Sequence, residues 1–318
     1  DAQVEKVVIA EGRATGVQIR RHQRVETISA NAEVILSAGA IGSPQLLMLS
    51  GIGAGGELSA HGIEVLSDLP GVGKNLQDHL QARPVFKTTL STVNTEINSY
   101  LKKGLIAAKY AFTQRGPMTM AASLGTGFLK TEAHLETPDI QFHIQPWSAL
   151  KPADGPHKFS AFTASVLQLR PESAGHLTLS SANIDDHPEI HPNYLSTDTD
   201  CRTIVKGIQI ARRIAQSEPL KSHITEEYAP GVGVALEDEV ATLEWARQTS
   251  VTIYHPTGTC KMGIDPMAVV DPSLKVKGIR GLRVADASIM PRIVSGNTNA
   301  PAIMIGEKAS QLVLEDAS

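Results

Sequence analysis

Short apolar runs separated by turn residues open the chain. Residues 4–9 and 14–20 take their apolar positions mainly from valine and isoleucine, and Glu11-Gly12-Arg13 stands between them. β-branched residues on either side of a glycine turn predict a hairpin of two strands. Residues 32–37 form a further short apolar run that ends before Gly39, and this run predicts a third strand.

The periodicity changes in the middle of the chain. Apolar residues recur at helical spacing over residues 98–113, and Gln114-Arg115-Gly116-Pro117 then ends this predicted helix. The same kinds of pattern predict strands at 139–145, 162–169 and 175–179, and helices at 199–215, 237–248 and 300–314. Strands placed between helices in this way indicate an α+β domain, in which an antiparallel sheet carries helices on one face.

The composition narrows the class of protein. A chain of 318 residues with 42% hydrophobic residues is long enough for one or two domains with buried cores. The formal net charge of −4 gives no basic footprint for nucleic acid, and no apolar run reaches the roughly 20 residues that span a bilayer. Cys201 and Cys260 lack the spacing of metal ligands, so we expect ordinary thiols and no metal site. A cytoplasmic or inner-membrane-associated location fits this composition.

Candidate chemistry is concentrated near the C-terminal end. Tyr254-His255-Pro256-Thr257-Gly258-Thr259-Cys260 supplies an imidazole, which is the usual general base near neutral pH. Gly296-Asn297-Thr298-Asn299-Ala300-Pro301 then forms a turn that opens the helix predicted at 300–314. A helix start favours a developing negative charge, because its first N–H groups lack acceptors and its dipole is positive there. A base and such a helix end suit the removal of a proton and then of a hydride.

The amino-acid sequences of these segments also resemble those of a known family. Together with Val269-Val270-Asp271-Pro272 and residues 282–291, they resemble the C-terminal signature of the glucose-methanol-choline (GMC) oxidoreductases. Residues 39–53 resemble the second fingerprint of that family. Residues 71–79, which read GVGKNLQDH, resemble the stretch that leads into its substrate domain. The three matches follow in family order, so the resemblance covers nearly the whole chain.

The resemblance implies an FAD-dependent enzyme that oxidises the CH–OH group of a primary alcohol or of choline to the aldehyde. The implied fold class is α/β plus α+β, with a partial FAD-binding domain at 1–79 and 264–318. A substrate-binding domain at 80–263, built on an antiparallel sheet with helices on one face, is inserted between these parts. His255 would then fall where the two domains meet, which is a usual place for a pocket.

The resemblance also assigns two catalytic residues. His255 matches the catalytic histidine, which would take the hydroxyl proton or hold the alkoxide while a hydride passes to flavin N5. Asn297 matches a second position, which the resemblance places opposite His255 across the flavin ring as a hydrogen-bond donor to the substrate oxygen. The structural alternatives are a buried histidine bonded to the backbone, and an asparagine that caps a turn.

The residues that would contact FAD follow from the same resemblance: Val4, Ala38, Gly39, Ser43, Asp286, Ala287, Asn299, Ala300 and Pro301. The first turn of the last helix would stabilise the negative charge of the reduced flavin. Asp286 and Ala287 would lie beside the ribityl-phosphate chain, and the backbone of Val4 would meet the adenine. The alternatives are a turn cap at Asp286 and tight strand–helix packing at Ala38 and Gly39.

A glycine motif at Gly51, Gly53 and Gly56 has the letters of a dinucleotide-binding turn. That turn must follow a strand, whereas residues 44–50 predict a helix that starts with Pro44 just inside a Ser43 cap. We therefore interpret Gly51 as the residue that ends a helix. The N-terminal GxGxxG unit of the family is absent from this sequence, so we expect it to be the C-terminal portion of a longer polypeptide.

Several readings stay open at this stage. A hydroxynitrile lyase of the GMC family would use His255 as its base without net redox chemistry, and a fragment that lacks bound FAD would be catalytically silent. The electron acceptor, a quinone or oxygen, and the oligomeric state are not indicated by the sequence. Choline would require an aromatic or acidic cage, for which Tyr100, Phe142 and Trp147 are candidates.

Overall fold

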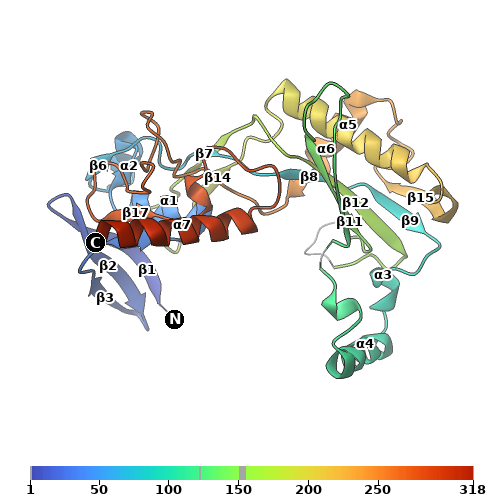
Figure 1. Cartoon of the computed structure of the whole chain (residues 1–318), viewed down its shortest axis with the longest axis horizontal. Helices are drawn as coiled ribbons and strands as arrows, with labels where there is room; N and C mark the ends of the chain where they lie inside the picture. Colours follow the sequence, from blue (N-terminus) through green and yellow to red (C-terminus); the bar gives the residue numbers. More distant parts are fainter. Residues whose placement is uncertain (1, 122, 150–154, 318) are drawn as a thin grey trace. The chain divides into compact units, whose positions relative to one another are not determined.

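The computed structural model describes residues 2–121, 123–149 and 155–317, and it contains two compact units (Figure 1). Unit 1 comprises Asp1–Asp78, Pro171–Tyr194 and Tyr254–Ser318, and unit 2 comprises His79–Arg170 and Leu195–Ile253. The first change of unit lies one residue from the boundary expected at 79/80. Residues 171–194 and 254–263, which the sequence placed in the middle domain, pack in unit 1 because their strands and loops pair with residues 74–78.

Unit 1 opens with an antiparallel sheet of β1 (Gln3–Ala10), β2 (Arg13–Arg21) and β3 (Arg24–Ser29). The predicted hairpin is confirmed, and its turn residues Glu11 and Gly12 both adopt positive φ, at 49° and 69°. The sequence did not predict β3, because all six of its residues are exposed and no buried alternation marks the strand.

The next strand, β4 (Val34–Leu36), pairs in parallel with β17 (Leu282–Val284) and leads into helix α1 (Gly39–Leu49). The prediction that α1 begins at Pro44 was wrong, because the helix begins at Gly39 and contains Pro44. Proline cannot donate to the carbonyl four residues before it. The hydroxyl of Thr259 donates to that carbonyl, on Ala40, at 2.6 Å, so the early start leaves the acceptor satisfied.

The glycine motif after α1 is not a nucleotide-binding turn after a strand. Helix α1 ends at the C-cap Ser50, and Gly51 follows with φ +80°, which confirms its reading as a helix stop. Beyond it, β5 (Ile52–Gly53) pairs in parallel with β6 (Ser67–Asp68), and the short helix α2 (Gly55–Ala60) lies between these strands in the chain.

The remaining elements of unit 1 join distant parts of the chain. Strand β13 (Gly175–Thr178) pairs on one side with β7 (Lys74–Leu76) and on the other with β14 (Glu189–His191). Near the C-terminus, the short 3-10 helix η4 (Ala287–Ile289) packs on α1, and helix α7 (Asn299–Ala317) follows. One continuous core underlies these elements, and it includes the buried residues Leu47, Ile52, Leu177, Val269, Val270 and Val284.

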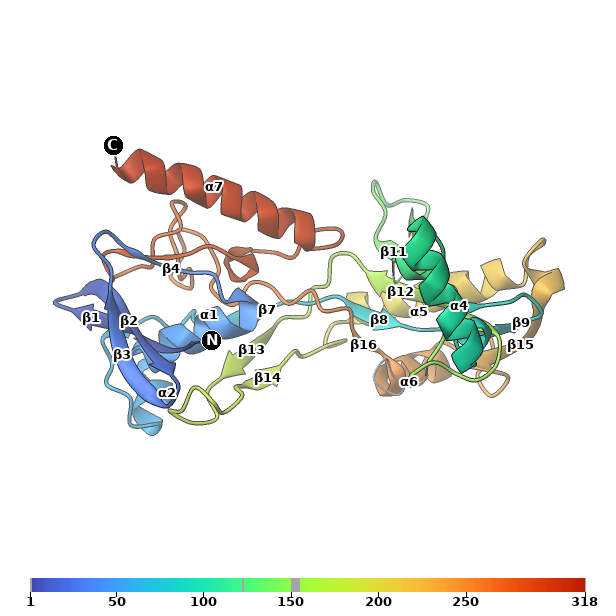
Figure 2. The same ribbon diagram turned by 90° about the horizontal axis from the view of Figure 1, so that it is seen from below.

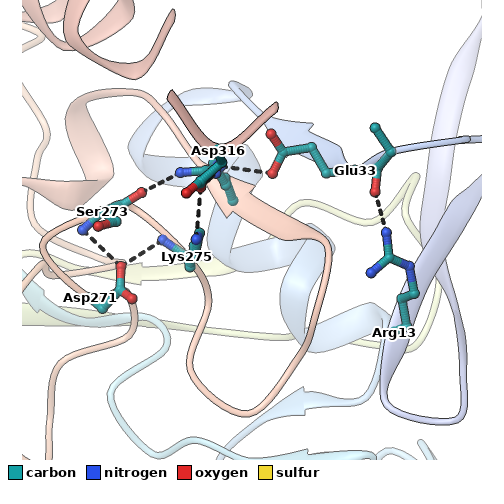
Figure 3. A network of polar contacts seen from close by, with 8 residues as sticks. Arg13, Glu33, Asp271, Ser273, Lys275 and Asp316 are labelled. Carbon is teal, nitrogen blue, oxygen red and sulfur yellow. Dashed lines mark hydrogen bonds and ion pairs between the residues drawn. The ribbon is translucent and has the colours of Figure 1, made fainter. Parts of the chain in front are cut away.

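The buried Arg283 joins α7 to the parallel strand pair. Figure 3 labels its partners Glu33, Ser273 and Asp316. The Arg283 side chain is 2% exposed, and its Nε lies 2.7 Å from a carboxylate oxygen of Glu33. Its Nη1 donates to the Ser273 carbonyl at 2.7 Å, and its Nη2 bonds to Asp316 near the end of α7. Asp316 also pairs with Lys275 at 2.7 Å, so the last helix is connected to β17 and to the loop that precedes it.

Unit 2 is built on one antiparallel sheet (Figure 2). Its seven strands are β8 (Leu80–Ala82), β9 (Val85–Thr88), β10 (Gly125–Leu129), β11 (Ile140–Gln145), β12 (Ala161–Gln168), β15 (Ile224–Ala229) and β16 (Val251–Thr252). Helix α5 (Asp198–Ala215) packs along β12, and α6 (Glu239–Thr249) packs on α5. The predicted antiparallel sheet with packed helices is therefore confirmed.

The described residues of unit 2 also form the helical elements α3 (Val93–Glu96), α4 (Tyr100–Thr113), η1 (Pro117–Thr119) and η3 (Lys221–His223). Helix α4 confirms the helix predicted at 98–113, but none of its residues is buried. Within the described ranges, no helix combines the length and the apolar character needed to cross a membrane.

Candidate active site

The structure brings the two predicted catalytic residues into contact within unit 1. Nδ2 of Asn297 lies 3.3 Å from Nε2 of His255. An amide that donates to Nε2 requires the tautomer with the proton on Nδ1, and that tautomer leaves the lone pair on Nε2. The expectation that Asn297 stands opposite His255 across a ring was wrong, because atoms 3.3 Å apart leave no space for a ring between them.

The environment of His255 favours its neutral form. The residue is only 8% exposed, and this burial lowers the pKa of its imidazole below the ordinary value of 6.5. The negative charge of Asp78 opposes the shift but is the smaller effect. A neutral imidazole can accept a proton at physiological pH, as a general base must.

A carboxylate fixes the backbone of this histidine. Oδ1 of Asp78 accepts a hydrogen bond of 2.9 Å from the backbone N–H of His255, and the Tyr194 hydroxyl donates to Oδ2. Asp78 is buried, and it follows directly after the β7 region of unit 1. Three separate segments of unit 1 therefore meet at one carboxylate next to the candidate base.

The stretch before Asp78 aligns both catalytic segments. The main chains of Gln77 and Thr257 exchange two hydrogen bonds of 3.1 and 2.9 Å, and Oε1 of Gln77 accepts from the Ile293 N–H at 3.0 Å. Nδ2 of Asn75 donates to the carbonyls of Gly258 and Pro291, at 3.3 and 3.2 Å. Gln77 and Asn75 thus tie the loop of His255 to the loop that leads to Asn297.

Local backbone geometry explains why glycine is needed beside this contact. Gly258 has φ +89°, and a Cβ at this position would stand 2.4 Å from the carbonyl oxygen of Asn75. Tyr254, directly before His255, also adopts positive φ, at 65°, which is uncommon for a residue with a Cβ. The packing of the 75–78 stretch therefore imposes an unusual backbone path around the histidine.

Four of the residues expected to contact FAD form a second polar cluster. Oδ2 of Asp286 accepts from the Gly39 N–H at 2.9 Å and from the Ser43 hydroxyl at 2.5 Å. The Ser43 oxygen in turn accepts from the N–H of Ala38 at 3.0 Å. Asp286 also caps η4, where Ala287 is the first residue, so the turn-cap alternative holds for this aspartate.

Two features of this region suit a bound cofactor. Gly39 has φ +79°, and a Cβ built on it would meet no atom within 4 Å, so the backbone there borders open space. At the start of α7, Asn299 and Ala300 are exposed and Pro301 is partly buried, and the N–H groups of a first helical turn have no acceptor within the helix. Val4 lies on β1 and packs against the core of unit 1.

The structure bears on the prediction of two ordinary thiols. Cys201 and Cys260 are both free, and the complete burial of Cys260 raises the pKa of its thiol far above the usual range. In the part of the chain that the structure describes, no group of three or more histidine, cysteine, aspartate or glutamate residues is placed to hold a metal ion.

Sequence profiles described as GMC oxidoreductase match residues 1–81 and 171–306, which together make up more than half of the chain. The chain belongs to the GMC oxidoreductase family. Its curated relatives include the alcohol dehydrogenase [acceptor] of Pseudomonas putida, with 43% identity over 99% of this chain and 57% of the relative. The mitochondrial choline dehydrogenase of Homo sapiens is 41% identical over 98% of this chain and 52% of its own.

Solved structures support the same family. A formate oxidase variant from Aspergillus oryzae RIB40 superimposes with a TM-score of 0.92 and 27% identity, over 99% of this chain and 60% of its own. Pyridoxine 4-oxidase from Mesorbium loti superimposes with a TM-score of 0.82 and 26% identity, over 98% of this chain and 56% of its own. This GMC chain thus spans a little over half the length of the proteins it matches.

Sequence reasoning missed two residues that contact the base or its support. Asp78 stood inside the GVGKNLQDH segment of the GMC resemblance, but its side chain was given no role, and Tyr194 was not singled out. A signal for Asp78 was available, because an acidic residue in a family segment next to a domain boundary is a candidate partner for a base. No local pattern marks Tyr194, which reaches Asp78 across 116 residues of sequence.

Proposed function

We propose that this chain carries the catalytic base of an FAD-dependent oxidoreductase that oxidises a primary alcohol, or choline, to the aldehyde. The contact of His255 with Asn297 is the observation that carries the proposal. A neutral imidazole and an amide at hydrogen-bond distance can bind one hydroxyl group together. The names of the relatives, alcohol dehydrogenase [acceptor] and choline dehydrogenase, support the same reaction class.

In the proposed mechanism, the alcohol hydroxyl replaces the Asn297 amide as the partner of Nε2 of His255, and Nε2 then accepts the hydroxyl proton. Asn297 donates an N–H to the same oxygen and holds the negative charge that develops there. Oxidation to the aldehyde removes one proton and one hydride from the alcohol, and His255 keeps the proton. Asp78 holds the backbone of the base in place throughout and stabilises the imidazolium that forms.

FAD would supply the acceptor for the hydride. The cluster of Ala38, Gly39, Ser43 and Asp286 would hold the cofactor on the side of α1, where the backbone at Gly39 borders open space. The first turn of α7, with Asn299, Ala300 and Pro301, would stabilise negative charge on the reduced ring. We also expect Ala287 and Val4 to contact the bound FAD.

Among substrates, the aromatic residues favour a neutral alcohol over choline. Phe142 is buried in the core of unit 2, so its ring cannot take part in an open cage. The guanidinium of Arg83 lies 5.6 Å from the ring centre of Trp147, and a quaternary ammonium would meet a positive charge there. We therefore expect primary alcohols to reduce the flavin more efficiently than choline does.

Anaerobic mixing of the FAD-loaded protein with alcohols and with choline tests the proposal. Flavin absorbance should bleach with the wild-type protein, and His255→Ala should keep the bound flavin but lose about 10²- to 10⁴-fold in reduction rate. His22→Ala, which removes an exposed histidine of unit 1, is the matched control. Unchanged reduction in His255→Ala would show that another group is the base.

The two alternatives give different results in the same preparation. A lyase would release cyanide from mandelonitrile while an artificial electron acceptor stays oxidised, whereas the proposed enzyme would reduce the acceptor with an alcohol. A chain that is silent by itself would show no flavin bands after incubation with excess FAD. The longest natural polypeptide that contains this chain should then restore them.

A further inference from the structure

Helix α4, which is labelled in Figure 1, exposes a stripe of apolar side chains to solvent. Leu101, Leu105, Ala108 and Phe112 recur at helical spacing, so they lie along one face of the helix. Leu101, Leu105 and Phe112 are 74%, 62% and 90% exposed. A surface helix normally turns such a face towards a core, so this stripe calls for a partner outside unit 2.

The opposite side of α4 is the one that contacts the rest of unit 2. Ile106 and Tyr110 are the partly buried residues of the helix, and at about 100° per residue they lie about 130° and about 170° around the helix from the middle of the stripe. The stripe therefore lies on the more exposed side of α4, away from Ile106 and Tyr110. The hydrophobic pattern that predicted a core-facing helix marks an outward face instead.

The charged residues in the stretch of sequence that carries the stripe are all basic. Residues 97–131 contain no aspartate or glutamate, although the whole chain has a formal net charge of −4. Five cations fall within this stretch: Lys102, Lys103, Lys109, Arg115 and Lys130. At helical spacing, Lys102 and Lys109 flank the apolar stripe on one side. Their long side chains can keep the ammonium groups in water while the apolar stems cover buried surface.

We propose that α4 is an interfacial helix that docks on an anionic phospholipid membrane. An apolar face bordered by lysines suits such a surface, because the apolar residues enter the headgroup region while the cations meet lipid phosphates. Nucleic acid would bind the cations but would leave the apolar stripe uncovered. A second copy of the protein would cover the stripe, but it would not require a stretch that lacks acidic residues. The membrane is the partner that uses both features, and this inference is independent of the proposed catalytic function.

Sedimentation with lipid vesicles tests the proposal. The chain, and in parallel the longest natural polypeptide that contains it, should sediment with phosphatidylcholine vesicles that contain phosphatidylglycerol, and much less with phosphatidylcholine alone. Leu105→Ser with Phe112→Ser, and separately Lys102→Glu with Lys109→Glu, should each weaken partitioning at least about tenfold at roughly 0.15 M salt. Circular dichroism of each variant checks that the fold is kept.

Two control pairs match these variants. Val232→Ser with Val240→Ser removes two exposed apolar residues elsewhere in unit 2, and Arg202→Glu with Lys221→Glu makes the same change in charge away from α4. Both pairs should bind vesicles like the wild type. The proposal is overturned if the wild type does not bind anionic vesicles, or if the control pairs weaken vesicle binding as much as the α4 pairs do. It also fails if the longer polypeptide does not bind, or if the stripe variants instead abolish self-association.

Discussion

Asp78 accepts a hydrogen bond of 2.9 Å from the backbone N–H of His255, across 177 residues of sequence. The same carboxylate accepts from the hydroxyl of Tyr194, and it lies in a buried position. It therefore does two things for the candidate base: it holds the backbone, and it places negative charge beside the imidazole. These two effects can be separated by substitution.

Asp78→Asn keeps an oxygen that can accept from the His255 N–H but removes the charge. Because Asp78 raises the pKa of His255, the variant should lower that pKa further, and the acidic limb of the pH profile of flavin reduction should move to lower pH. The rate at pH values above the limb should change little. If the acidic limb stays at the same pH, the charge of Asp78 does not affect the pKa of His255.

Asp78→Ala should behave differently, because it leaves the backbone N–H of His255 buried without its acceptor. We expect a loss of about 1–3 kcal/mol in the free energy of unfolding, measured with urea, and a lower rate at every pH. Comparison with Asp78→Asn separates positioning from charge. Equal stability of the two variants would contradict the positioning role.

The wild-type protein should lose activity on acidification. Burial lowers the pKa of His255 below 6.5, so the neutral base predominates at neutral pH, and flavin reduction should fall as the pH drops through the lowered pKa. The folded state also binds this proton more weakly than the unfolded chain, so stability should decline as the pH falls below 6.5. If this histidine contributes, the free energy of unfolding measured with urea should fall more steeply below pH 6.5 for the wild type than for His255→Gln.

Asn297 allows the opposite shift to be tested. Asn297→Asp places a carboxylate near Nε2 of His255, which should raise the pKa of the imidazole and move the acidic limb to higher pH. Asn297→Ala removes the donor to the substrate oxygen and should slow flavin reduction by about 10²-fold while FAD stays bound. If Asn297→Ala reduces flavin at the wild-type rate, the residue is only a turn cap.

The Arg283 network predicts a large effect on stability away from the candidate site. Arg283→Met leaves Glu33 without its buried partner and releases Asp316 from β17, so we expect a loss of about 3–5 kcal/mol in urea unfolding. Arg280→Met is the matched control, since Arg280 is exposed and its guanidinium donates to the backbone carbonyl of Glu11. An equal effect of the two substitutions would contradict a special role for the buried network.

Much of the local structure was predictable from the sequence. The hairpin at the start, the strands at 140–145 and 161–168, and helices α5, α6 and α7 follow patterns of apolar residues that neighbours in sequence define. The sequences of the motifs indicated the family, and the same motifs identified His255 and Asn297 as candidate catalytic residues. These signals are local, so tertiary contacts were not needed to detect them.

Other features depend on contacts between distant segments. The early start of α1 requires the Thr259 hydroxyl, and the role of Asp78 requires Tyr194 and the His255 backbone to reach the same carboxylate. Periodicity predicted α4 as a helix, but only the tertiary structure decided that its apolar stripe lies on the more exposed side, away from Ile106 and Tyr110. The sequence by itself determined many of the longer elements and the family to which the chain belongs. The tertiary structure decided which side chains meet and which face of a helix stays exposed, because such contacts join residues that no local pattern connects.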